Sequence, residues 1–231
     1  MIKAIFFDID GTLYSYEKGN RKAMEALADY AHKNFSWESE TLFSVLQEVN
    51  AAIVSELNST SAIHNRLIRF QRALYKYGIP VFPHAMNMYL LYWNTLIESS
   101  AAFEGVSQAL SSLKDSGFKI MAVTNMTAFI QFIKLQDLYL TKYFDYILTS
   151  EEVGSEKPDF KMFHKASELS GCNISECVYV GDSIKNDYYG ALEAGMKAIW
   201  FCGEETGTVE DVLSFSKWSD LPGIIGSLND H

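Results

Sequence analysis

The chain has 231 residues, of which 48% are hydrophobic and 21% are charged, and 19 basic against 29 acidic side chains give a formal net charge of −10. This composition is average for a globular protein and excludes a disordered, collagen-like or coiled-coil chain. The acidic balance argues against a nucleic-acid polymer or an anionic membrane as a partner, because either would be met by a basic surface. The length allows one large domain, or a domain that carries a substantial insertion.

Two features of the sequence bear on its location. The first apolar stretch is interrupted by Asp8 and Asp10, which does not fit a signal peptide. The longest uninterrupted apolar run elsewhere, residues 88–93, is far shorter than the ~20 residues that a membrane-spanning helix needs. We therefore expect a cytoplasmic protein with no membrane partner.

The first predicted element is a short strand. Residues 2–7 form an apolar run rich in Ile and Phe that ends in Asp-x-Asp-Gly-Thr, which is typical of a strand buried on both faces with a turn after it. Between residues 16 and 100 the chain changes to Ala, Leu, Glu, Lys, Met and Gln at helical spacing, interrupted near 58–61 and 78–83. This pattern predicts about four helices and no strand.

After Phe103 the predicted strands and helices alternate. Strands are predicted at 119–123, 146–149, 177–180 and 198–201, and helices at 106–114, 128–135, 161–169, 188–194 and 221–228. Such alternation indicates a parallel sheet with helices on both faces. The sequence thus predicts an α/β, Rossmann-like fold in which residues 1–15 and 101–231 form the core. Residues 16–100 would be an inserted, all-helical domain.

In an open α/β sheet, ligands bind beyond the carboxyl ends of the strands, and here those ends carry polar residues. They are Asp8 and Asp10 after the first strand, Thr124 and Asn125 after the second, Lys157 after the third, and Asp182 and Asp187 after the fourth. Clustered carboxylates repel each other unless a divalent cation joins them, and oxygen-only ligands favour Mg²⁺ over zinc. A cation, an ammonium and a hydroxyl in one place suit a phosphoryl group, whose transfer depends on positioning and charge neutralisation.

Four short segments occur in a fixed order over nearly the whole chain: Asp-Ile-Asp-Gly-Thr-Leu at 8–13, Thr124, Lys157-Pro158, and Gly-Asp-Ser at 181–183 followed by Asp187. In this order they resemble the four motifs of the haloacid dehalogenase superfamily of phosphohydrolases. The helical insertion resembles the family's mobile C1-type cap. Within the family, the chain looks most similar to small phosphomonoester phosphatases such as the pyrimidine 5′-nucleotidase group.

The resemblance implies roles for the residues that handle the phosphoryl group. Asp8 would be the nucleophile, and Asp10 would be the general acid for the leaving oxygen and then the general base for water. Thr124 and Asn125 would bind the transferring phosphoryl group, and Lys157 would steady its charge. Asp10 also argues against dehalogenation, because the family's dehalogenases resemble this motif with the second aspartate replaced.

The same resemblance implies a Mg²⁺ site. Asp8 and Asp182 would bind the metal through their carboxylates, and Asp10 would bind it through its backbone carbonyl. Asp187 would act in the outer shell of the metal or orient Lys157, and whether it touches the metal is left open.

The predicted cap contains two further patterns that allow two interpretations each. Arg66, Arg69 and Arg72 recur every three residues, which favours a solvated helix face whose long stems cover apolar neighbours. Contact with an anionic substrate is the alternative. The aromatic residues of 89–93 could stack on a base or a sugar, although such clusters more often belong to a core.

Together these observations predict a Mg²⁺-dependent phosphatase of nucleoside monophosphates or sugar phosphates that acts through an aspartyl phosphate. The partner would be a small phosphorylated metabolite, and the protein would be a monomer or a weak homodimer. Two alternatives stay open. A phosphomutase of the β-phosphoglucomutase kind would share the core motifs, and a non-catalytic phosphate-binding protein would keep only a relic of the site.

Overall fold

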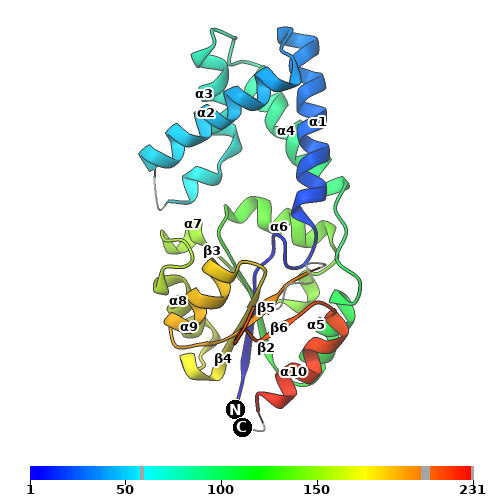
Figure 1. The fold of residues 1–231 in the computed structure, drawn as a ribbon, viewed down its shortest axis with the longest axis vertical. Coiled ribbons are helices and arrows are strands. Elements are labelled where there is room, and N and C mark those ends of the chain that lie inside the picture. Colours follow the sequence, from blue (N-terminus) through cyan, green and yellow to red (C-terminus); the bar gives the residue numbers. More distant parts are fainter. Residues whose placement is uncertain (58–59, 204–208, 230–231) are drawn as a thin grey trace. The chain divides into compact units, whose positions relative to one another are not determined.

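A computed structural model describes residues 1–57, 60–203 and 209–229 of the chain (Figure 1). The chain divides into two compact units. One consists of Met1–Ser15 and Ala101–His231, and the other of Tyr16–Ser100. We call them the core unit and the helical unit.

The core unit is built on a parallel sheet with the strand order β3-β2-β1-β4-β5-β6. The strands are β1 (Ala4–Phe7), β2 (Lys119–Thr124), β3 (Tyr146–Thr149), β4 (Cys177–Gly181), β5 (Lys197–Phe201) and β6 (Ser214–Phe215). The order reverses between β1 and β4, which makes the crevice at their carboxyl ends the usual ligand site of such sheets. The predicted Rossmann-like α/β fold is confirmed.

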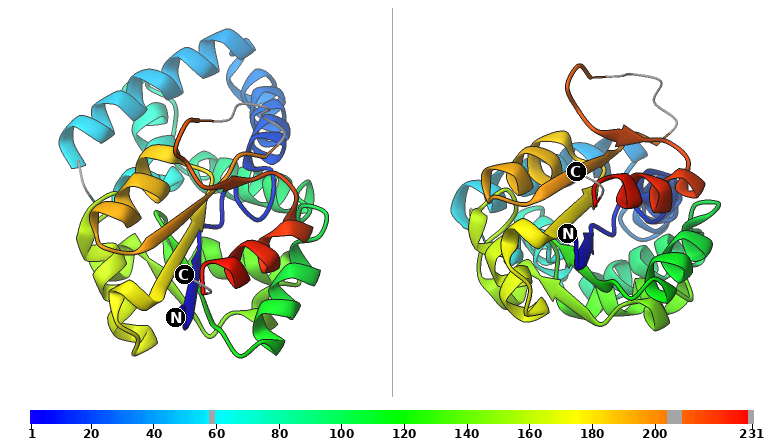
Figure 2. Two further views of the ribbon diagram at one scale, coloured as in Figure 1. Left: turned by 60° about the horizontal axis from the view of Figure 1, so that its bottom comes forward. Right: turned by 90° about the horizontal axis from the view of Figure 1, so that it is seen from below.

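Helices cover both faces of this sheet (Figures 1 and 2). On one face lie α8 (Phe160–Ser170) and α9 (Gly190–Glu193), and on the other lie α5 (Val106–Asp115) and α10 (Leu221–Ser227). Alternate residues of β1 point to opposite faces of the sheet. Phe6 packs in the cluster with α8 and α9, whereas the ring of Phe7 packs on Trp218 at a centroid distance of 5.9 Å. Burial on both faces explains why β1 is apolar throughout.

The remaining described helical segments of the core unit connect these elements. They are α6 (Ala128–Asp137), α7 (Ser150–Val153), the π-helix η4 (Ile184–Tyr189) and the 3₁₀ turns η2 (Thr141–Tyr143), η3 (Ile174–Glu176) and η5 (Trp218–Asp220). The expected helix at 188–194 is therefore corrected, because the chain turns helical earlier, at Ile184. The reason is local: the Ser183 side chain accepts a hydrogen bond from the Asn186 N–H at 3.1 Å and caps the segment.

The helical unit contains four α-helices among its described residues, as the spacing predicts. They are α1 (Tyr16–Phe35), α2 (Ser39–Leu57), α3 (Arg66–Lys76) and α4 (His84–Glu98), with a 3₁₀ turn η1 (Ser61–His64) before α3. Contacts run from α1 to α4, α4 to α3, α3 to α2 and α2 to α1. Their facing stripes are apolar at four-residue spacing, as in Met88, Tyr92 and Leu96 of α4. None of the described helices is long and apolar enough to cross a membrane.

Candidate active site

The turn after β1 is the first part of the site. Asp8 continues the ladder one residue beyond the strand, since its N–H donates to the Val180 carbonyl at 2.9 Å. The chain then turns at Gly11, whose φ of +87° favours glycine. A Cβ on Gly11 would lie 2.3 Å from Oδ2 of Asp182. The glycine therefore lets the loop after β1 approach the loop after β4.

Lys157 is the central cation of the site. Its side chain is 3% exposed, and its ammonium donates to Oδ1 of Asp8 at 2.7 Å, to Oδ1 of Asp187 at 2.7 Å and to the Tyr179 hydroxyl at 2.6 Å. An ammonium has three donors, so all are used. Burial acts to lower the pKa of Lys157, but the carboxylates of Asp187 and Asp8 raise it well above its usual value. Lys157 is therefore a permanent positive charge between two buried acids.

The backbone of Lys157 is held by Asn125. The Asn125 side chain donates to the Lys157 carbonyl at 2.9 Å and accepts from the Lys157 N–H at 2.7 Å. Both polar atoms of the Asn125 side-chain amide are thus hydrogen-bonded to the backbone of Lys157. This geometry suits a residue that positions the lysine, and the expected binding of phosphate by Asn125 stays a prediction.

Three carboxylates gather beside Lys157. Asp8, Asp182 and Asp187 each offer an oxygen, and these oxygens lie within 4.8 Å of one another. Asp8 and Asp187 are buried, whereas Asp182 is exposed. Burial raises the pKa of Asp8 to about 8, with Lys157 opposing the rise and Asp187 adding to it. With all three acids ionised, three carboxylates against one ammonium carry a charge of −2 (1 − 3), and a divalent cation such as Mg²⁺ would both balance this charge and favour the ionised form of Asp8.

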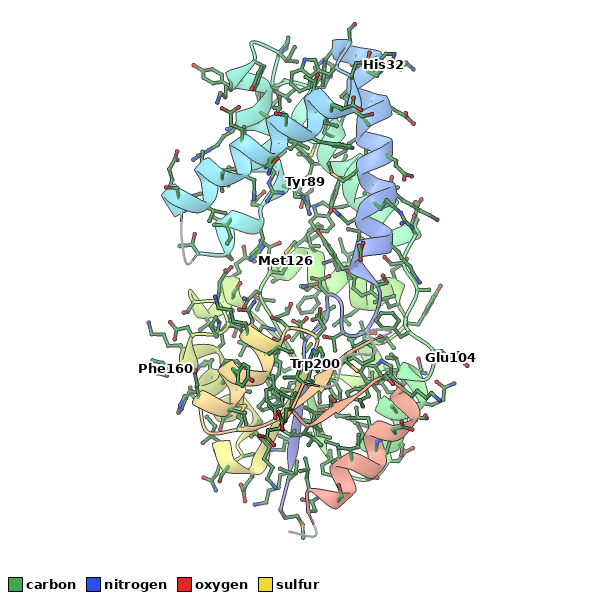
Figure 3. The ribbon with its side chains drawn as sticks, viewed as in Figure 1. His32, Tyr89, Glu104, Met126, Phe160 and Trp200 are labelled. Atoms are coloured by element: carbon green, nitrogen blue, oxygen red, sulfur yellow. The ribbon has the colours of Figure 1, made fainter. Side chains whose placement is uncertain are left out.

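Neighbouring groups fix the orientation of the two acids that follow β4. Thr12 donates to Oδ1 of Asp182 at 3.1 Å and accepts from its N–H at 3.0 Å. The indole of Trp200, labelled in Figure 3, donates to the Asp182 carbonyl at 2.7 Å. Asp187 lies in the π-helix, and its Oδ2 accepts from the Ser183 N–H at 3.0 Å. Irregular helical turns of this kind are frequent at functional sites.

Gly181 gives a test of this packing. A Cβ at this position would lie 2.4 Å from Cγ of Asp187, so Gly181→Ala must displace the Asp187 carboxylate and the lysine bonded to it. We expect kcat to fall about 10²-fold, the size of effect that a displacement of ~1 Å can have. Gly223→Ala is the matched control, because a Cβ there meets nothing within 4 Å. Equal phosphate-release rates for the two variants would contradict the proposed role of Asp187.

The Asp10 carboxylate has partners that the sequence analysis missed. Lys134 donates to both of its oxygens, at 2.6 and 2.9 Å, Gln131 donates to Oδ2 at 2.8 Å, and the Tyr14 hydroxyl donates to Oδ1. Burial acts to raise the pKa of Asp10, but Lys134, Tyr14 and Gln131 together bring it below its usual value. Gln131 also donates to Oγ1 of Thr124 at 2.9 Å and so links the two expected catalytic and phosphate-binding residues.

A sequence signal for these partners exists, but it is weak. Gln131 and Lys134 stand three residues apart on α6, so they share one helix face, and both are buried. Two polar side chains on the buried face of a helix suggest a shared buried partner. Nothing in the pattern names that partner, because Asp10 lies 124 residues before Lys134.

Residues 5–201 match the family model of haloacid dehalogenase-like hydrolases, and the chain belongs to this family. The resemblance carried by the four motifs is confirmed. Membership of this family also fits the ion pairs that the buried Lys157 forms with Asp8, which follows β1, and with Asp187, which follows β4.

Two curated relatives and one solved structure illustrate the similarity. The chain is 32% identical over 203 residues to a ribulose-1,5-bisphosphate 5-phosphatase from Halopiger xanaduensis, covering 87% of this chain and 85% of the relative. It is 32% identical over 214 residues to a glyceraldehyde 3-phosphate phosphatase from Methanothermobacter thermautotrophicus, covering 91% and 90%. The crystal structure of a 2-haloacid dehalogenase from Pseudomonas syringae superposes with a TM-score of 0.78 at 25% identity, covering 99% and 100%.

Proposed function

We propose that this protein is a Mg²⁺-dependent phosphatase that hydrolyses small phosphomonoesters through an aspartyl phosphate on Asp8. The observation that carries the proposal is the ammonium of Lys157, held 2.7 Å from both Asp8 and Asp187. Two relatives that are 32% identical over most of the chain are named as phosphatases of phosphorylated sugars. Sugar phosphates are therefore the first substrate class to test, and nucleoside monophosphates, as for a nucleotidase, are the second.

The proposed mechanism gives each of these acids a role. Bound Mg²⁺ would be held by Asp8, Asp182 and the Asp10 carbonyl, with Asp187 in its outer shell, and would supply charge that stabilises the phosphoryl oxygens. A carboxylate oxygen of Asp8 attacks phosphorus, the bond from phosphorus to the ester oxygen breaks, and Asp10 gives that oxygen a proton. Thr124 holds the phosphoryl group, and Lys157 balances its charge.

The second half of the reaction uses the same groups. Asp10, now ionised, takes a proton from the water that attacks the phosphorus of the aspartyl phosphate. The bond from phosphorus to Asp8 breaks, which frees phosphate and restores the carboxylate of Asp8. Lys134 and Gln131 favour the ionised form of Asp10, which is the form that this half requires. The first half requires Asp10 to take up a proton from solvent before the ester oxygen leaves, and the second half returns Asp10 to that protonated form.

Removal of the metal gives a direct prediction. EDTA is expected to reduce phosphate release from p-nitrophenyl phosphate to background, and excess Mg²⁺ is expected to restore it, because without a cation the three acids repel one another and the phosphoryl group, and Asp8 stays protonated near neutral pH. A melting curve recorded in EDTA is the control for folding. Activity that is indifferent to chelation would rule out the metal site.

Three assays separate the alternatives. A phosphomutase would isomerise a hexose 1-phosphate without net release of phosphate, and a non-catalytic protein would do neither. A dehalogenase would release chloride from 2-chloropropionate, and the presence of Asp10 with its three donors argues against that activity.

The same proposal includes three further expectations: the helical unit is the cap, the protein is cytoplasmic, and it is a monomer or a weak homodimer. Cell fractionation tests the location, and sedimentation tests the oligomeric state.

A further inference from the structure

Gln131 is a fully buried polar residue of the core unit to which the proposed mechanism gives no contact with the substrate. Its side-chain nitrogen donates to Oδ2 of Asp10 at 2.8 Å and to Oγ1 of Thr124 at 2.9 Å. A side-chain amide carries two hydrogens, so both are used. One side chain therefore joins the expected acid of the reaction to the hydroxyl that is expected to hold the phosphoryl group.

The oxygen of the same amide has no hydrogen-bond partner in the described part of the chain. Oε1 of Gln131 is buried, and a buried acceptor without a donor destabilises a fold. Asn125 shows the contrast, since both polar atoms of its amide are bonded to the Lys157 backbone. A glutamine that served packing alone would gain stability by satisfying both ends. The arrangement of Gln131 therefore indicates a role in the reaction.

The neighbours of Gln131 fix which way its amide lies. The Asp10 carboxylate accepts hydrogen bonds from Lys134 and from the Tyr14 hydroxyl as well as from Gln131. If the amide were turned over, its oxygen would lie against a carboxylate oxygen, and two acceptors repel each other. The nitrogen of Gln131 is therefore the atom that faces both Asp10 and Thr124.

The bond from Gln131 determines the direction of the Thr124 hydroxyl. A hydroxyl has one hydrogen and can also accept, whereas an amide nitrogen can only donate. Oγ1 of Thr124 is thus the acceptor in this bond, and its own hydrogen points elsewhere. Thr124 is buried, and its side chain makes no second hydrogen bond within residues 1–57, 60–203 and 209–229. The hydrogen is therefore available to a ligand at the end of the strand.

We propose that Gln131 is a positioning residue that directs the hydrogen of the Thr124 hydroxyl to an oxygen of the phosphoryl group that passes from the ester to Asp8. This inference rests on the proposed phosphatase function and deepens it. Thr124 ends β2, the neighbour of β1, and so lies at the same edge of the sheet as Asp8. A donor that is directed before the reaction begins needs no reorganisation when the charge on the phosphoryl oxygens changes.

A double-mutant cycle tests this role, with 2,4-dinitrophenyl phosphate as the substrate. Gln131→Met keeps a side chain of similar size and removes the amide. We expect it to lower kcat/KM about 10- to 100-fold in the parent and in Thr124→Ser, which keeps a hydroxyl. In Thr124→Val, which has no hydroxyl, the same change is expected to lower kcat/KM by no more than about twofold. An equal loss in all three backgrounds would overturn the proposal.

The choice of ester shows whether Gln131 acts through Thr124 or through Asp10. The phosphoryl group is common to all esters, so the loss of kcat/KM caused by Gln131→Met is expected to be comparable on 2,4-dinitrophenyl phosphate and on a sugar phosphate. Only the sugar phosphate has a leaving oxygen that needs a proton from Asp10. A loss confined to the sugar phosphate would therefore contradict the proposal.

Gln136→Met is the matched control, because Gln136 lies on the same helix and is exposed. It is expected to change none of these rates. The melting temperature of Gln131→Met should lie within about 4 °C of that of Gln136→Met, since the buried amide that it loses has one end without a partner. A larger drop would make Gln131 a structural residue and would also overturn the proposal.

Calorimetry with inorganic phosphate and Mg²⁺ separates this inference from the proposed function. If no ester is hydrolysed but Gln131→Met weakens phosphate binding in the parent and not in Thr124→Val, the phosphatase proposal fails and the role of Gln131 stands. If esters are hydrolysed and Gln131→Met lowers neither kcat/KM nor the affinity for phosphate, the role of Gln131 fails and the phosphatase proposal stands.

Discussion

Asp8→Asn is expected to lower kcat for phosphate release at least about 10³-fold, because an amide does not attack phosphorus as a carboxylate does. The substitution keeps the size of a side chain that is almost fully buried beside Lys157. The measurement is phosphate release from p-nitrophenyl phosphate and from a sugar phosphate, each with excess Mg²⁺.

The fold of this variant should survive, which makes the loss interpretable. Lys157 keeps its bonds to Asp187 and Tyr179, so its charge stays paired. We therefore expect a far-ultraviolet spectrum like that of the parent and a cooperative melting curve. A folded Asp8→Asn protein with full activity would exclude Asp8 as the nucleophile.

Lys157→Met is expected to abolish activity and also to destabilise the protein. The change removes the cation that lies 2.7 Å from Asp8 and from Asp187, so two buried carboxylates face each other without a counter-charge. Loss of one partner from a buried ion pair typically lowers the free energy of unfolding by about 3–5 kcal/mol. Urea unfolding in EDTA measures this effect without a bound cation.

Lys161→Met provides the matched control for this variant. Lys161 is a nearby lysine on α8 whose side chain is 62% exposed, with its Nζ 4.0 Å from Asp159. Its replacement is expected to change the free energy of unfolding by no more than about 0.5 kcal/mol. If Lys157→Met were as stable as Lys161→Met, the buried charge network would not be the arrangement described.

Much of the core unit follows from short-range patterns. The strands predicted after residue 103 lie within one residue of β2, β3, β4 and β5 at each end, because a strand buried on both faces is a continuous apolar run. The strand β6 was missed, since its two residues, Ser214 and Phe215, are too few to form a pattern. The π-helix at Ile184–Tyr189 was missed because it depends on capping by Ser183 rather than on helical periodicity.

The sequence predicts the part of the candidate site that lies at the carboxyl ends of the strands. The register that pairs Phe7 with both Ala122 and Val180 brings the residues after β1, β2 and β4 to one edge of the sheet. What the sequence could not give were contacts between side chains distant in the chain. The engagement of Asn125 with the Lys157 backbone and the bond from Gln131 to Asp10 are of this kind.

The most direct test of the account is to trap the phosphoryl group on Asp8. Asp10→Asn removes the base for the second half of the reaction, whereas 2,4-dinitrophenyl phosphate has a leaving group that needs no proton in the first half. After acid quench and peptide mass spectrometry, we predict a phosphoryl group on Asp8 that approaches one per chain. A phosphoryl group on another residue, or steady release of phosphate with none on Asp8, would contradict the account.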